Sequence, residues 1–259
     1  MSRKTFCVEA RRAEVTGGRG GKSRKVNIIL HLRPTSSPNR KESKGDAALA
    51  FKVRLRFGRD EAASWYPHQA VMNAFSRAAR MSGIPVRFTE GFDPHPRITI
   101  PYALSVGIPG DVEALELELH SWCKPSEVAA RLNAFLPRGI RVNRARLVPP
   151  RRASFVVTAA CYEAVLPAEA LPGAPEAVER LLAAEEWVVE RGGKKKRTVD
   201  IRPYIESLEL EGATLSMRLK VTGRGTARPR EIAAAVVGDG FDVRLVPIRK
   251  TKLEIRDAD

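Results

Sequence analysis

The chain has 259 residues, of which 43% are hydrophobic and 29% charged, a balance typical of globular proteins. Its 45 Lys+Arg against 30 Asp+Glu give a formal net charge of +15, which favours a polyanionic partner such as RNA, although a basic protein of an Arg-rich proteome would also fit. Three scattered cysteines exclude a disulfide framework and a local CxxC site, and no apolar run reaches the ~18 residues of a membrane span. We therefore expect a cytoplasmic protein with no membrane partner, no metal site and no cofactor in this chain.

The first 50 residues hold 12 Lys+Arg and 4 Asp+Glu and are punctuated by Gly, Ser and Pro. Such a composition predicts a basic, mostly disordered tail over residues 1–50. The tail can serve as an RNA-binding arm, can be merely solvated, or can reflect a start codon placed too far upstream.

Residues 51–57 alternate apolar and basic side chains, which predicts a half-buried strand with one cationic face. The segments that follow are a helix over 65–82, extended stretches at 86–88 and 98–106, an alternating strand at 114–119, a helix at 125–135 and a strand at 140–148. The order β-α-β-β-α-β predicts a ferredoxin-like half over residues 51–150.

The same order recurs over residues 151–250. Strands are expected at 155–165, 187–189 with 198–201, 207–210, 215–221 and 241–248, and helices at 175–184 and 230–237. The predicted fold class is therefore α+β, with two tandem ferredoxin-like halves and a C-terminal tail at 251–259.

Residues 89–97, Thr-Glu-Gly-Phe-Asp-Pro-His-Pro-Arg, form the most distinctive segment. Two prolines stiffen the loop, so its polar side chains keep set directions. Asp93 and His95 are weak candidates for acid–base catalysis, and His95 and Arg97 can instead bind an anion. A purely structural loop is the alternative.

Two further segments are rich in cations. Residues 223–231 carry Gly223, Gly225 and three arginines before an expected helix, a pattern that can receive a phosphate or can form a simple turn. Residues 194–197 form a basic run at a hairpin, which can contact phosphates or can be a solvated turn. Arg202 and Tyr204 follow and can stack on bases, although Tyr204 can equally lie in the core. The candidate nucleic-acid- or anion-binding residues are Arg54, Arg56, Arg87, Arg97, Lys194, Lys195, Lys196, Arg197, Arg202, Arg224, Arg228 and Arg230.

Residues 90–97, together with 83–85 and 104–107 in the first half and 196–205 and 228–231 in the second, resemble the radical SAM-linked domain of unknown function. The resemblance spans roughly residues 51–250. It implies a gene neighbourhood of radical SAM proteins and ribosomal proteins, and hence a separately encoded radical SAM partner. Because this chain has no CxxxCxxC, the iron–sulfur cluster of such a partner would sit on the other polypeptide.

These observations lead to an expected function: an accessory RNA-binding or scaffold protein that assists a radical SAM enzyme acting on RNA or on a translation component. Two alternatives stay open. One is an RNA-acting enzyme, a nuclease or base-modifying enzyme, that uses the Asp93-His95-Arg97 loop. The other is a pure protein–protein adaptor.

Overall fold

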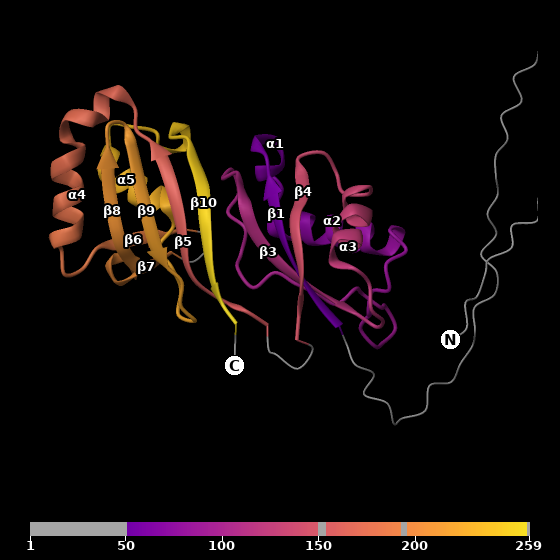
Figure 1. Ribbon diagram of the computed structural model, residues 1–259. Helices are drawn as coiled ribbons and strands as arrows, with labels where there is room; N and C mark the ends of the chain where they lie inside the picture. The colour runs from indigo at the N-terminus through magenta and orange to yellow at the C-terminus, as the bar shows by residue number, and fades with distance from the viewer. Residues whose placement is uncertain (1–50, 150–153, 193–195, 258–259) are drawn as a thin grey trace, which may run out of the picture. The chain divides into compact units, whose positions relative to one another are not determined.

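The computed structural model describes residues 51–149, 154–192 and 196–257, so the tail expected at residues 1–50 lies outside them. This part of the chain is mixed α+β, with a mostly antiparallel eight-stranded sheet (Figure 1). No helix in it is long and apolar enough to cross a membrane. The elements follow in the order β1 (Phe51–Arg59), α1 (Glu61–Ser64), α2 (His68–Met81), β2 (Ile98–Thr99), β3 (Gly110–Leu119), α3 (Pro125–Asn133), β4 (Ile140–Val148), β5 (Val156–Val165), α4 (Ala174–Ala183), β6 (Val188–Arg191), β7 (Arg197–Asp200), β8 (Ile205–Glu211), β9 (Thr214–Lys220), α5 (Pro229–Val237) and β10 (Ile248–Arg256).

In the first half, residues 51–149, the sheet runs in the order β4-β1-β3, and β2 pairs with the other edge of β3. All of these pairs are antiparallel. The period-two pattern of β1 places Val53, Leu55 and Phe57 in a core that they share with the apolar stripe of α2. Phe57 meets Phe75 of α2 edge-to-face, with ring centroids 4.9 Å apart.

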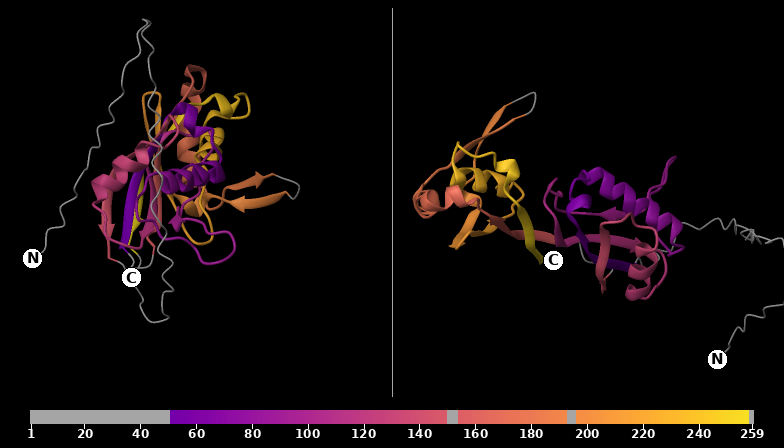
Figure 2. Two further views of the ribbon diagram at one scale, coloured as in Figure 1. Left: turned by 90° about the vertical axis from the view of Figure 1, so that its right-hand side faces the viewer. Right: turned by 90° about the horizontal axis from the view of Figure 1, so that it is seen from above.

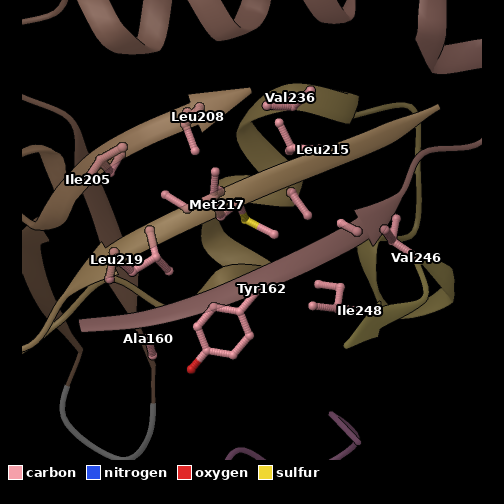
Figure 3. Close-up of a cluster of buried hydrophobic side chains, with 14 of the residues drawn as sticks. Ala160, Tyr162, Ile205, Leu208, Leu215, Met217, Leu219, Val236, Val246 and Ile248 are labelled. Carbon is pink, nitrogen blue, oxygen red and sulfur yellow. The ribbon is translucent and has the colours of Figure 1, made fainter. Parts of the chain in front are cut away.

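In the second half, residues 154–257, the order is β10-β5-β9-β8, again with antiparallel neighbours. The core gathers side chains from these strands and from α4 and α5, among them Leu208, Leu215, Met217 and Tyr162 (Figure 3). The hairpin β6–β7 forms a separate two-stranded sheet that extends from this half (Figure 2).

The two halves join where β10 pairs in parallel with β3 at Lys250 and Gly110. A Cβ at Gly110 would lie 2.6 Å from the Lys250 carbonyl oxygen, so this close approach requires glycine. The guanidinium of Arg56 then donates to the carbonyls of Val112 and Leu253, at 3.0 and 3.3 Å. Arg56 therefore supplies donors to both strands where the ladder between β3 and β10 is not continued.

The strand expected over residues 241–248 is wrong. Asp242 accepts a hydrogen bond from the amide of Arg244 and starts a 3-10 turn at Val243–Leu245. The last strand, β10, begins at Ile248 and runs to Arg256, through residues expected to form a C-terminal tail.

Residues 86–88 and 98–106 also contribute less strand than expected. Val86 makes an isolated bridge to Leu119, and β2 is limited to two residues. Pro101 lacks an amide hydrogen, which is consistent with the early end of β2. The other expected strands and helices are confirmed, with bounds that shift by a few residues.

Candidate binding loop and junction clefts

The segment from Thr89 to His95 is a braced loop, called here the Phe92 loop. Its base is closed by a bridge between Phe88 and Pro96. The amide of Thr89 donates to the His95 carbonyl at 2.8 Å, and the amide of His95 donates to Thr89 Oγ1 at 2.9 Å. Gly91 has a φ of 127°, which a residue with a side chain rarely adopts. These contacts close the base of the loop and restrict the conformations of its tip.

Phe92 lies at that tip, and its ring is fully exposed, at 108% of the reference value. A guanidinium N–H of Arg80, near the end of α2, donates to the carbonyl of Pro94 and supports the loop from behind. The sequence interpretation selected the polar neighbours of Phe92 and missed the ring itself. Its one available signal was an aromatic residue inside a proline-stiffened polar loop.

Asp93 and His95 face solvent and pair with each other. Their side chains are 79% and 63% exposed, and Oδ2 of Asp93 lies 3.2 Å from Nε2 of His95. Neither residue lines the clefts described below. Acid–base catalysis requires a second polar group and a bound substrate within hydrogen-bonding reach, and this geometry supplies no support for it.

The arginines beside the loop differ in exposure. Arg97 is 38% exposed and lies 3.8 Å from the carboxylate of Glu118. Arg87 is partly exposed at the same sheet edge, where its amide donates to the Glu118 carbonyl. These two side chains remain available to an anion at the base of the Phe92 loop.

Arg54 and Arg56, expected on an exposed cationic face, do not form one. Arg54 is 2% exposed, stacks over the ring of Phe155 at 4.5 Å, and pairs with Glu116 at 2.8 Å and Asp257 at 2.5 Å. Arg56 is only partly exposed, and its guanidinium contacts two backbone carbonyls, as described above. The expectation of exposure is wrong for Arg54, because the second half packs on this face of β1.

Four buried polar residues and the partly buried Tyr102 form a cluster, called here the junction cluster. The buried members are Arg59, Glu113, Tyr162 and Lys250. Lys250 Nζ lies 2.6 Å from Glu113 Oε1, and Arg59 Nη2 lies 3.6 Å from the same atom. Lys250 Nζ also sits 4.9 Å from the ring centroid of Tyr102, whose hydroxyl is 3.2 Å from that of Tyr162. Sequence reasoning did not select these residues, which are far apart along the chain.

Burial sets the protonation behaviour of the junction cluster. It lowers the pKa of the Lys250 ammonium, and the opposing attraction of Glu113 offsets only part of this effect. Burial also raises the pKa values of Tyr162 and Tyr102, that of Tyr162 well above its ordinary value. Both tyrosines therefore stay neutral at pH 7 and act as a hydrogen-bonded pair.

Two clefts open next to the junction cluster. The α5 cleft, of about 450 Å³, is lined by residues 102–106, 108 and 226–230. The Trp65 cleft, of about 360 Å³, is lined by Glu61, Ser64, Trp65, Gly107, Pro109, Glu163, Val165, Arg230 and residues 244–249. Arg230 separates them and donates to the carbonyls of Gly107 and Val243 at 3.2 and 3.0 Å. Volumes of this size suit small ligands.

The turn before α5 was expected to cradle a phosphate with its backbone amides. Glu231 already occupies that position: its Oε2 accepts from the amide of Arg228 at 2.9 Å. The same carboxylate receives two hydrogen bonds of 2.7 Å from Arg191. A carboxylate thus caps the start of α5, which leaves the exposed side chains of Arg224 and Arg228 as the available cations.

The basic hairpin is only partly described, since Lys194 and Lys195 lie outside the described residues. Lys196 pairs with Glu190 at 2.7 Å, and Arg197 is exposed. Arg202 has a structural role, because its guanidinium donates to the carbonyls of Leu182, Ala184 and Ile205.

The charge of the protein is distributed unevenly. The described residues hold 29 of the 45 Lys+Arg and 25 of the 30 Asp+Glu, so they carry a formal charge of +4 out of +15. Most of the excess therefore belongs to residues 1–50 and to the short segments at 150–153 and 193–195. The sequence-based electrostatic argument for RNA applies mainly to those segments.

Within the part of the chain that the structure describes, no group of three or more His, Cys, Asp or Glu side chains could hold a metal ion.

Comparison with known proteins gives the family of the chain. No curated protein matches the chain. A family model described as an uncharacterized protein conserved in bacteria, DUF2344, matches residues 52–229, which include the Phe92 loop and the turn before α5. The chain therefore belongs to the DUF2344 family.

Proposed function

We propose that this protein is an accessory RNA-binding protein that assists a separate enzyme, a radical SAM enzyme by the resemblance noted above. Three features support the proposal. The basic residues 1–50 supply a sequence-independent attraction to phosphates. The Phe92 loop supplies a rigid aromatic ring, and the described residues bring no catalytic set together around Asp93 and His95.

The fold part of this proposal is a tandem of ferredoxin-like halves. The pairing orders β4-β1-β3-β2 and β10-β5-β9-β8, both antiparallel, support it, since each is the order that a split β-α-β-β-α-β unit produces. RNA readers of this class often use the open face of the sheet. Here Phe155 packs against Arg54 on that face of the first half, which favours a loop as the contact.

The exposed ring of Phe92 is the observation that carries the proposal. Single-stranded RNA binds proteins through bases stacked on aromatic side chains, with cations nearby for the phosphates. Phe92 makes no contribution to the core, and His95, Arg87 and Arg97 lie on the same loop or at its base. The proposed contact is thus a base on Phe92 with phosphates at these cations.

The test is fluorescence anisotropy of the full chain with a labelled single-stranded RNA at about 50 and 200 mM salt. The variant Phe92→Ala should weaken binding by about tenfold, because a stacked base contributes about 1–3 kcal/mol. Trp122→Ala, which removes another exposed ring, 60% exposed, from a different loop, is the control and should bind like wild type. Binding that is insensitive to salt, or equal in both variants, would contradict the proposal.

A protein adaptor is the second candidate, and the modest charge of the described residues favours it. A pull-down of tagged protein with and without nuclease separates the two. A partner retained after nuclease and lost in Phe92→Ala would assign the loop to protein docking. A partner lost after nuclease treatment would be held through RNA, which would support the RNA-binding proposal.

A further inference from the structure

The α5 cleft combines features of a ligand site that the proposed RNA-binding loop does not use. Its walls are largely apolar, from Leu104, Ile108 and Ala227, and Val106 stands half-exposed at its edge. The charged side chains among its described lining residues are those of Arg228 and Arg230, with no carboxylate. The Trp65 cleft, by contrast, has Glu61 and Glu163 in its lining beside Arg230, Arg244 and Arg249. Of these arginines, Arg244 and Arg249 are already paired with Asp242 and Asp111. An anion is therefore accepted more readily in the α5 cleft.

The two arginines of the α5 cleft are not equivalent. The guanidinium of Arg230 is already used by the carbonyls of Gly107 and Val243. The side chain of Arg228 is 62% exposed, and its nearest carboxylate, that of Glu231, lies 3.9 Å away. Because Arg191 holds that carboxylate in two hydrogen bonds of 2.7 Å, Arg228 is the side chain free to turn toward a ligand.

Tyr102 supplies a fixed aromatic wall. Its hydroxyl is held by Tyr162 at 3.2 Å, and the buried ammonium of Lys250 sits 4.9 Å from its ring centroid. A ring held by such contacts loses little freedom when a planar group packs on it. The cleft therefore offers a flat surface at one side and a cation at its mouth.

We propose that the α5 cleft binds a nucleoside monophosphate group, with the base against Tyr102 and the phosphate at Arg228. The group can be a free nucleotide or the 5′-phosphorylated end of an RNA chain, because both present the same chemistry. The inference does not rest on RNA binding by the Phe92 loop. The volume of about 450 Å³ falls within the range of small-ligand sites.

The experiment is isothermal titration calorimetry of the full chain with four probes. They are AMP, adenosine, and an RNA trinucleotide that carries either a 5′-phosphate or a 5′-hydroxyl. We expect one molecule of AMP or of the phosphorylated trinucleotide to bind, and the phosphate-free probes to bind at least about tenfold more weakly. Binding of AMP would identify a nucleotide site, and binding of the phosphorylated trinucleotide alone would identify an RNA-end site. No binding of either phosphorylated probe would overturn the proposal.

Two pairs of variants locate the site. Arg228→Gln should lose about tenfold in affinity for the phosphorylated probe, while Arg180→Gln, which removes an exposed arginine on α4, should bind like wild type. Val106→Asp places a negative charge at the mouth and should weaken binding similarly. Val106→Asn, whose side chain has the same shape as aspartate without the charge, should not. Val106 is 48% exposed, so both variants should fold. Equal losses within either pair would overturn the assignment of the cleft.

The two proposals fail separately. Phe92→Ala should leave AMP binding unchanged, and Arg228→Gln should leave the stacking contribution of Phe92 unchanged. If RNA binding by the full chain is absent while AMP binding persists, the proposed function fails and the nucleotide site stands.

Discussion

The molecule has two groups of basic side chains that differ in their exposure to solvent. Arg54, Arg59 and Lys250 lie at the junction of the halves, are at most 2% exposed, and each has a carboxylate within 4 Å. Arg97 and Arg228 are 38% and 62% exposed, with carboxylates nearly 4 Å away. Burial therefore separates the cations that hold the junction together from those that remain open to solvent. Removing the partner of a buried cation strongly destabilises the fold, whereas removing the partner of an exposed cation has little effect on stability.

The largest expected effect comes from removing the shared carboxylate of the junction cluster. Glu113→Gln leaves Lys250 and Arg59 buried without their counter-charge and should reduce the free energy of unfolding by about 3–5 kcal/mol. Urea denaturation followed by circular dichroism measures the loss. The double variant Glu113→Gln, Lys250→Met should recover part of it, and a single-variant loss below about 1 kcal/mol would contradict this account of the cluster.

A smaller effect is expected where Arg56 bridges β3 and β10. Lysine cannot span the carbonyls of Val112 and Leu253, so Arg56→Lys should reduce the free energy of unfolding by about 1–2 kcal/mol. Hydrogen exchange of β10 amides should rise more than that of β8 amides, which lie at the far edge of the second half. Equal protection in both strands would argue that Arg56 does not hold the junction.

A surface ion network should contribute less again. Hydrogen bonds from Arg218 and, to a smaller extent, from Lys252 hold the pKa of Glu254 at about 2, below its ordinary value of 4.5. The stabilisation is therefore present above pH 4.5 and lost as pH falls through about 2. Because the network is open to solvent, it should amount to less than about 1 kcal/mol. Unfolding measured from pH 6 to pH 2 should show a shallower decline in Glu254→Gln than in wild type.

The smallest effect on stability is expected at the most exposed ring. Phe92 is fully exposed, so Phe92→Ala should change the free energy of unfolding by no more than about 0.5 kcal/mol. Thermal unfolding by calorimetry provides the measurement. A clear destabilisation would show that the ring supports the loop and would remove the basis for treating it as a contact residue.

Much of the fold could be predicted from local patterns. The alternation in β1 and β3 and the helical spacing in α2 and α3 were sufficient, because each of these elements has one buried face. β10 was missed because Lys250, buried against Glu113, gives the strand a polar appearance. A buried charge can be recognised only when its partner is known, and Glu113 lies 137 residues away.

The candidate site was predicted less well for the same reason. The alternation that identified β1 as a strand also placed Arg54 on its non-core face, and nothing local to β1 revealed that Ser154, Phe155 and Asp257 would cover that face. Residues 89–95 lie in a loop, as their composition predicted. The exposed aromatic tip of this loop could be recognised only once the braced conformation was known.

The parallel contact between β3 and β10 has a consequence for biosynthesis. The ribosome makes β10 after every other described element, so Arg59 and Glu113 leave the exit tunnel long before Lys250 exists. Until then β3 lacks its partner at Gly110, although β2 already pairs with residues 116 and 117 of the same edge. The nascent second half lacks the strand that pairs with the edge of β5. Chains whose translation stops before residue 248 should therefore expose the edge of β5, and cellular proteases should remove them selectively.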